Sequence, residues 1–201
     1  MRRDKLIKAV LVVALVVLSA SYAYATEEFF FARVNGFQEI GALAGPTGAI
    51  RSNATGTMHL TLDKSAGTAT WTLTYTDVGT TQPLTGTVTQ AHIHFGKKHV
   101  AGGVLVFFCS NLATPPPGGA QGCPNNSGTI TGTFSAANVQ AIAGQNVTAN
   151  DFDALVDALE SNTAYANIHT TALGAGEIRG QIHRIRRDRD DKDHDDKDHH
   201  R

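Results

Sequence analysis

The sequence predicts a mainly β domain, an antiparallel sandwich or barrel with one short helical insert. Short blocks of the chain alternate apolar and polar residues with a period of two. Glycine, proline and asparagine separate these blocks, and only one segment has clear helical spacing. Many short strands joined by such turns are typical of β-sandwiches and barrels.

Eight blocks are predicted to be strands. In residues 71–75, a tryptophan, a leucine and a tyrosine share one face, and threonines, which suit an exposed pleated surface, occupy the other. Residues 58–62 alternate in the same way, so residues 63–67 between the two blocks are predicted to form a hairpin loop. The remaining predicted strands are residues 29–34, 91–95, 103–108, 128–134, 164–170 and 177–183.

The helical insert is predicted over residues 151–159, DFDALVDAL. Its apolar residues recur at the three- and four-residue spacing of one helix face. Asn150 or Asp151 can cap its first turn. Residues 136–143 are predicted to form a shorter helical turn, and the helix is expected to pack across one end of the sheets.

Both ends of the chain are predicted to lie outside the folded domain, which spans residues 26–183. Basic residues precede a short apolar run, and small residues end at Ala25, the layout of a secretory signal peptide over residues 1–25. The apolar run is shorter than the roughly 20 residues of a membrane helix, so no membrane association is expected after cleavage. Residues 184–201 contain one aliphatic residue and seven aspartates, which predicts a disordered tail.

Charge and cysteine content limit the partners and the compartment. Between residues 26 and 183, acidic residues outnumber basic ones by ten to six, so no basic patch indicates a nucleic-acid partner. Cys109 and Cys123 enclose a loop rich in proline and glycine, and an isolated pair in an exported chain is most simply a disulfide. Two free thiols acting as metal ligands are the alternative. The expected location is the periplasm or the extracellular space.

Several separated motifs occur in a distinctive order along the chain. They are AHIHFG at residues 91–96, the loop between the cysteines, the helical segment, AYANIHT at 164–170 and GEIRGQI at 176–182. This set resembles the CHRD domain, named after chordin, over about residues 29–183. The resemblance implies an immunoglobulin-like or related β-sandwich in a bacterial exported protein. Animal members belong to extracellular antagonists of growth factors, and the resemblance supplies no catalytic residues.

Three of the predicted strands each combine an apolar face with a strongly polar face, because side chains alternate along a strand. If these strands are neighbours, their polar faces merge into one cluster. The last two are joined by a short loop and are predicted to pair, whereas the sequence does not identify the neighbour of the first. The polar faces carry His92 and His94, then Asn167 and His169, then Glu177, Arg179 and Gln181.

The histidines of this cluster admit two interpretations. Two imidazoles two residues apart on a strand can share one ion, and His169 would complete a three-histidine site for Zn²⁺ or Cu²⁺. Alternatively, the side chains form a hydrogen-bonded network in which Glu177 pairs with Arg179 or fixes the histidine tautomers. The fixed positive charge of Arg179 opposes a cation, so the network is the preferred interpretation.

No motif in the sequence indicates catalysis. No serine has a Gly-x-Ser-x-Gly setting, and the His-x-His strand resembles copper-zinc superoxide dismutase in that element alone. His194, His199 and His200 lie among aspartates and form a weak metal-binding candidate. The sequence therefore predicts a non-catalytic binding or structural module with an extracellular protein or surface partner. A protein that binds zinc or copper is the alternative, and no cofactor is otherwise expected.

Overall fold

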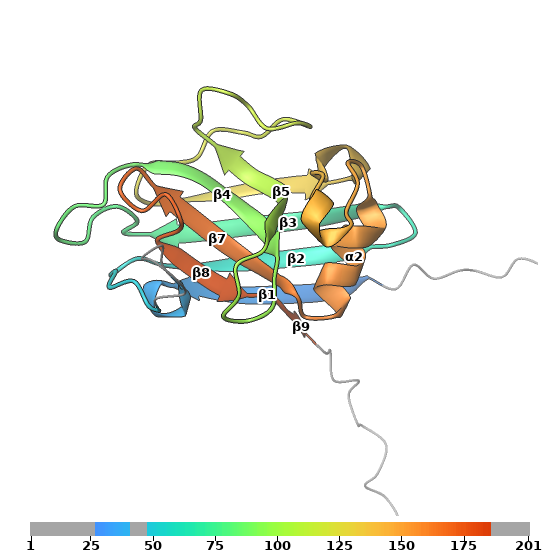
Figure 1. The fold of residues 1–201 in the computed structure, drawn as a ribbon, viewed down its shortest axis with the longest axis horizontal. Coiled ribbons are helices and arrows are strands. Elements are labelled where there is room, and N and C mark those ends of the chain that lie inside the picture. The colour runs from blue at the N-terminus through green and yellow to red at the C-terminus, as the bar shows by residue number, and fades with distance from the viewer. Residues whose placement is uncertain (1–26, 41–47, 186–201) are drawn as a thin grey trace, which may run out of the picture.

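The computed structural model describes residues 27–40 and 48–185 of the 201-residue chain (Figure 1). The predicted signal peptide lies outside the described residues. The same holds for residues 186–201, which include the three histidines of the predicted tail.

Nine strands form one antiparallel sheet that curls into a nearly closed barrel, as the alternating blocks predict (Figure 1). The strand order is β5-β4-β7-β8-β1-β2-β3-β6, β9 also pairs with β1, and the outer strands β5 and β6 contact each other. The strands are β1 (Glu28–Asn35), β2 (Thr55–Asp63), β3 (Thr68–Thr76), β4 (Val88–Phe95), β5 (Gly103–Ser110), β6 (Gly128–Phe134), β7 (Ala164–Thr170), β8 (Ile178–Gln181) and β9 (His183–Ile185).

The alternation of β3 shows how these strands divide core from surface. Trp71, Leu73 and Tyr75 are buried in the barrel, whereas the threonines between them face outwards. Trp71 stacks on Phe134 of β6, with ring centroids 5.2 Å apart, and meets the edge of Phe108 of β5 at 4.8 Å. These aromatic contacts pack the core where the two outer strands approach.

The helix α2 (Phe152–Glu160) closes the end of the barrel at which β7 begins (Figure 1). Asp151 is its N-cap, because its carboxylate accepts a hydrogen bond from the backbone N–H of Ala154 at 3.2 Å. Short 3-10 turns form η1 (Gly36–Gln38), η2 (Ala136–Asn138) and η3 (Ala143–Gln145), the second of these within the predicted helical turn. Among the described residues, no helix has the length and apolar character of a membrane span.

The last predicted strand is divided in two. The backbone N–H of Ile182 bonds to the carbonyl of Ala164, and this residue interrupts the strand between β8 and β9. β9 then runs to Ile185, which lies opposite Phe29 of β1. The regular structure therefore extends two residues into the segment predicted as the tail.

The two cysteines form the predicted disulfide, Cys109–Cys123. It fixes the long loop that follows β5, and the backbone N–H of Ser110 bonds to the carbonyl of Gln121 beside it. No free cysteine occurs in the described ranges. The alternative of two free thiols is therefore wrong.

Candidate metal centre

The polar faces of β4, β7 and β8 form one continuous surface, because these three strands are neighbours in the sheet. His92 lies opposite Asn167, which in turn lies opposite Arg179. Residues directly opposite each other in an antiparallel pair share a face. β7 is therefore the neighbour of the His-x-His strand that the sequence left open, and the merged surface faces away from the apolar core.

This outer surface is buried, unlike the threonine face of β3. The exposed fractions of His92, His94 and His169 are only 1%, 9% and 4%. Two connecting segments, residues 96–102 and 171–176, supply backbone carbonyls to the side chains of the surface. The three strands thus have protein on both faces, and their polar side chains have little contact with water.

Residues 96–102 are held down by side chains from β8. The guanidinium of Arg179 donates from Nη2 to the carbonyls of Lys97 and Val100, both at 3.0 Å. The amide of Gln181 donates to the carbonyl of Gly96 at 3.1 Å. These bonds fix the segment that covers the histidines.

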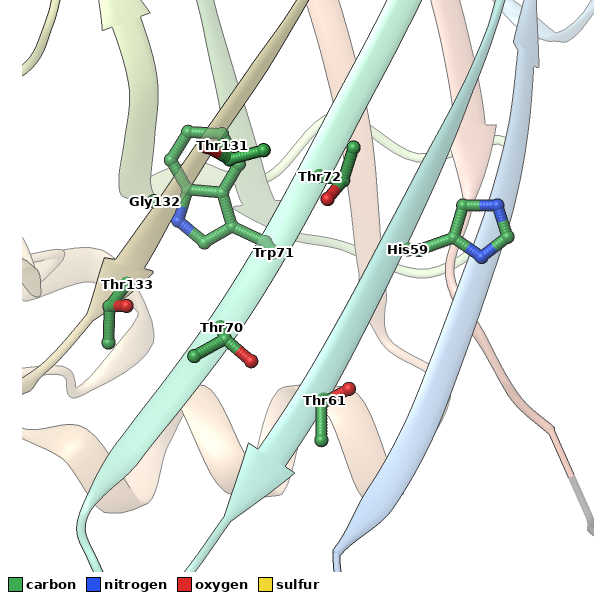
Figure 2. A pocket seen from close by; sticks show the side chains of 8 residues that line it. All are labelled: His59, Thr61, Thr70, Trp71, Thr72, Thr131, Gly132 and Thr133. Atoms are coloured by element: carbon green, nitrogen blue, oxygen red, sulfur yellow. The ribbon is translucent and has the colours of Figure 1, made fainter.

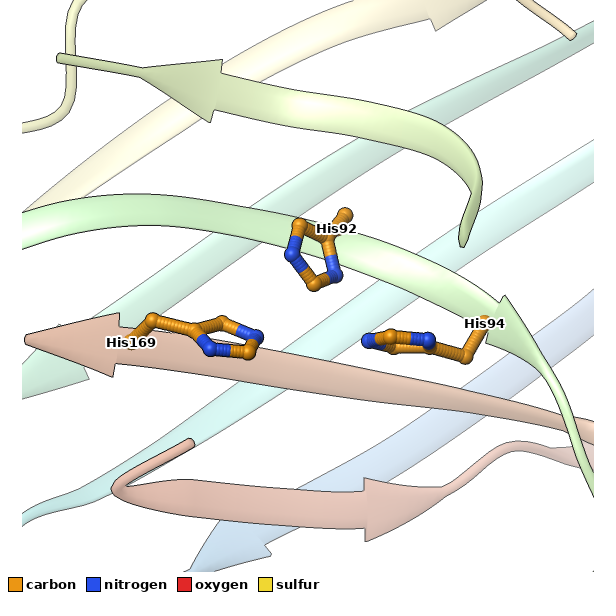
Figure 3. A group of neighbouring side chains, drawn as sticks. All are labelled: His92, His94 and His169. Carbon is orange, nitrogen blue, oxygen red and sulfur yellow. The ribbon is translucent and has the colours of Figure 1, made fainter. Parts of the chain in front are cut away.

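The three histidines meet within this buried surface (Figure 3). One ring nitrogen from each lies within 4.8 Å of a ring nitrogen from each of the others. The ring of His92 is 4.4 Å from both other rings, measured between centroids, whereas His94 and His169 are 6.2 Å apart. His92 therefore contacts both of the other two rings.

Two of the rings are held by backbone carbonyls. Nδ1 of His94 donates to the carbonyl of Gly102 at 2.7 Å, and Nδ1 of His169 donates to the carbonyl of Gly174 at 2.9 Å. A carbonyl oxygen only accepts, so each Nδ1 carries the hydrogen and each Nε2 keeps its lone pair. Metal-binding histidines are commonly oriented by such a bond from the opposite ring nitrogen.

Three ring nitrogens of the cluster are buried without a hydrogen-bond partner among the described residues. They are Nδ1 of His92 and Nε2 of His94 and His169. A buried polar atom left unpaired costs about 1–3 kcal/mol. A metal ion is one ligand that can use three lone pairs together.

Burial keeps the three imidazoles neutral near pH 7. Desolvation lowers the pKa of His94 to about 4 and that of His92 well below its usual range. The pKa of His169 is lowered for the same reason, although its bond to the Gly174 carbonyl partly opposes the shift. Neutral imidazole is the form that binds metals, so no proton must leave before an ion binds.

Aromatic rings frame the histidines. The ring of Phe107 on β5 meets His92 edge-on at 5.2 Å, and that of Tyr165 stacks on His94 at 4.6 Å with an interplanar angle of 10°. β5 is bulged opposite His92 and again opposite His94, and such bulges re-aim side chains. The histidines thus lie in an apolar frame.

The charge of Arg179 is held beside the histidines by other groups. Its guanidinium carbon lies 3.4 Å from the centroid of the Tyr165 ring, a cation–π contact. β7, which carries Tyr165, lies between the strands that carry His94 and Arg179. Arg179 therefore contributes positive charge near the cluster, and its Nη2 donates to the covering segment.

The spacing of the nitrogens can be compared with that of a bound ion. Metal–nitrogen bonds of about 2.0–2.1 Å place two tetrahedral ligands about 3.4 Å apart. Nitrogens within 4.8 Å of one another must therefore approach by up to about 1.4 Å. Rotation about the soft ring torsions of histidine can supply such a movement, and the three residues fit a metal ion.

The chain also matches a family model, that of the CHRD domain, over residues 30–182. The protein belongs to the CHRD domain family. No curated protein sequence matches it significantly. All three histidines of the cluster lie within the matched region.

Glu177 of this CHRD domain has partners other than those the sequence suggests. Its buried carboxylate accepts hydrogen bonds from the hydroxyls of Ser52 and Thr85, at 2.7 and 2.6 Å, and from the backbone N–H of Gly79 at 3.2 Å. No ion pair with Arg179 occurs among the described residues. The predicted polar cluster is therefore corrected at this position, since Glu177 joins loops and does not fix the histidine tautomers.

Asn167 has a carboxylate partner that the sequence analysis did not identify. Its amide donates to Glu39 at 2.6 Å and to the carbonyl of Ile178 at 3.0 Å. Glu39 is 3% exposed, and burial raises the pKa of its carboxyl. It follows the turn η1 and belongs to no alternating block, so strand periodicity offers no signal for it. Tyr165, by contrast, could be identified from the sequence, because the period of two places it on the same face as Asn167 and His169.

A hollow separate from the histidine cluster lies on the opposite wall of the CHRD domain, over β2, β3 and β6 (Figure 2). Threonine hydroxyls surround it, and its single titratable side chain, His59, packs on Phe31 at 4.9 Å. The hollow is open and brings no set of charged or metal-binding groups together. Its lining residues are His59, Thr61, Thr70, Trp71, Thr72, Thr131, Gly132 and Thr133.

Proposed function

We propose that this CHRD domain is an exported, non-catalytic protein that holds one zinc or copper ion between His92, His94 and His169. The observation that carries the proposal is the convergence of three neutral, buried imidazoles with nitrogens within 4.8 Å of one another. The hydrogen-bonded network that the sequence favours would give these nitrogens protein partners. Each histidine instead keeps one buried nitrogen without a partner among the described residues.

Export is supported by two independent features. The leader-like residues 1–25 have the layout of a secretory signal. The Cys109–Cys123 disulfide is of a kind that persists in oxidising compartments. Both features favour a periplasmic or extracellular site of action.

The non-catalytic assignment is supported by the way the nearby carboxylates are used. Glu39 accepts from Asn167, and Glu177 accepts from groups of two loops, one before β2 and one between β3 and β4. A general acid or base must lie within hydrogen-bond reach of the group that it protonates or deprotonates. Both carboxylates are engaged by donors of the protein itself, which favours a structural or carrier role for the ion.

The test is a titration of the purified, exported protein with Zn²⁺ and with copper, followed by a count of bound metal. We expect one equivalent per chain, and at least a 100-fold loss of affinity in the double variant His92→Ala plus His94→Ala. The matched control is His59→Ala plus His183→Ala, in which two exposed histidines are removed. Its affinity should equal that of the unaltered protein.

A second control separates this centre from the histidines of the tail. Deletion of residues 186–201 should leave one equivalent bound with unchanged affinity. Circular dichroism spectra of all variants should match that of the unaltered protein. Absence of binding, or binding that survives the double variant and disappears with the tail, would overturn the proposal.

A further inference from the structure

We infer that the three-histidine centre prefers monovalent copper, Cu⁺, to divalent zinc. This inference rests on the proposed function, since it assumes that His92, His94 and His169 hold the ion. Three features of the site carry it: the charge around the ligands, their burial, and the spacing of their nitrogens.

The charge around the site does not compensate a dication. All three ligands are neutral, and the guanidinium of Arg179, which packs on the Tyr165 ring, adds positive charge beside them. Glu39 is separated from His92 by Asn167, the residue directly opposite His92. Among the described residues, the cluster of potential ligands contains no carboxylate or thiolate.

Burial makes this uncompensated charge costly. The Born cost of transferring an ion from water to a low-dielectric site grows with the square of its charge, so a dication costs about four times as much as a monocation of equal size. The ligand histidines are at most 9% exposed, and Phe107 and Tyr165 pack against them. The site therefore discriminates against Zn²⁺ more strongly than an exposed set of three histidines would.

Coordination number favours the same ion. A zinc ion held by three histidines needs a fourth ligand, normally water or hydroxide. The burial of all three side chains limits the supply of that ligand. Cu⁺ is stable with two or three neutral nitrogen ligands, and imidazole suits copper.

The spacing of the nitrogens is compatible with a low coordination number. Two bonds of about 2.0 Å span about 4.0 Å when they are collinear, against about 3.4 Å at the tetrahedral angle. The nitrogens lie within 4.8 Å of one another, and a pair at that limit needs the smaller movement to become near-linear. In Figure 3 the rings of His94 and His169 face each other from two sides, and His92 lies over the gap between them.

The experiment compares the two ions on the same protein. Under anaerobic conditions, Cu⁺ is titrated in competition with bicinchoninate, and Zn²⁺ in competition with a chromophoric zinc chelator. We expect one equivalent of each to depend on His92 and His94, with Cu⁺ bound at least 1,000-fold more tightly. X-ray absorption of the Cu⁺ form should show two or three nitrogen ligands.

The outcomes separate this inference from the proposed function. Tight, histidine-dependent Zn²⁺ binding that equals or exceeds Cu⁺ binding would overturn the preference and leave the metal centre intact. Absence of histidine-dependent binding of either ion would overturn both. The variant His169→Asp replaces a neutral ligand by a carboxylate. The ratio of the Cu⁺ affinity to the Zn²⁺ affinity should then fall at least tenfold, and an unchanged or larger ratio would contradict the charge argument.

Discussion

The burial of His94 in its neutral form should make the metal-free protein less stable in mild acid. Burial lowers the pKa of this side chain to about 4, from an ordinary value of about 6.5. Between these two values the unfolded chain binds a proton that the folded protein excludes. The free energy of unfolding therefore falls as the pH decreases from 6.5 towards 4.

The size of the effect follows from the two pKa values. A shift of one unit corresponds to 1.36 kcal/mol, so the full shift of His94 is equivalent to about 3 kcal/mol. At pH 5.0, where the unfolded histidine is largely protonated, His94 alone should reduce the free energy of unfolding by about 2 kcal/mol. The lowered pKa values of His92 and His169 act in the same direction.

The assay is urea unfolding of the metal-free protein at pH 7.5 and pH 5.0. In His94→Gln, whose amide can still donate to the carbonyl of Gly102, the stability difference between the two pH values should shrink by about 2 kcal/mol. His59→Gln, at an exposed position, should retain the full difference. An equal pH dependence in the two variants would refute the reasoning.

Three further predictions concern the loops, the disulfide and the ion. Replacement of Glu177 by Gln should lower the free energy of unfolding by about 3 kcal/mol, because its charge-assisted bonds from two loops are weakened. Replacement of Cys109 and Cys123 by serine should lower the free energy of unfolding by about 3 kcal/mol, because the disulfide closes a loop with a sequence separation of 14. Metal affinity should fall less than about tenfold between pH 7.5 and 5.5, since His94 with a pKa of about 4 competes weakly for protons.

Each of these predictions has a control. Urea unfolding checks the prediction for Glu177→Gln. The control is Glu27→Gln, at an exposed position, which should leave the free energy of unfolding unchanged. For the second, the unaltered protein in a reducing buffer should match the double-serine variant, and equal stability with and without reductant would contradict it. For the third, three ordinary histidines would lose about 1,000-fold over the same pH range. A loss of that size would show that the ligands are not the buried histidines.

Strand alternation was sufficient to predict which side chains share a face. It separated His92 and His94 from Ala91 and Ile93, and it placed His169 on the polar side of its own strand. The cysteine pair and the helix with its Asp151 cap also follow from local sequence signals. These features depend on residue type and on short-range spacing.

The rest depends on contacts between distant parts of the chain. The pairing of β4 with β7 is a long-range contact that neither strand encodes alone. The carbonyls of Gly102 and Gly174 orient two histidines, and a backbone carbonyl has no residue-type signature. The period of two predicts that Glu177 and Arg179 share a face. The partners of Glu177, however, come from loops that strand periodicity does not describe.

The pairing of the first strand with the last gives the domain a particular response to mechanical force. β1 begins beside the end of β9, where Phe29 lies opposite Ile185 (Figure 1). Tension applied between these two ends would pull antiparallel neighbours apart from one edge, so their paired residues would separate one after another and not all at once. The short strand β9 would separate first. β8, whose Arg179 and Gln181 hold the segment over the histidines, would follow.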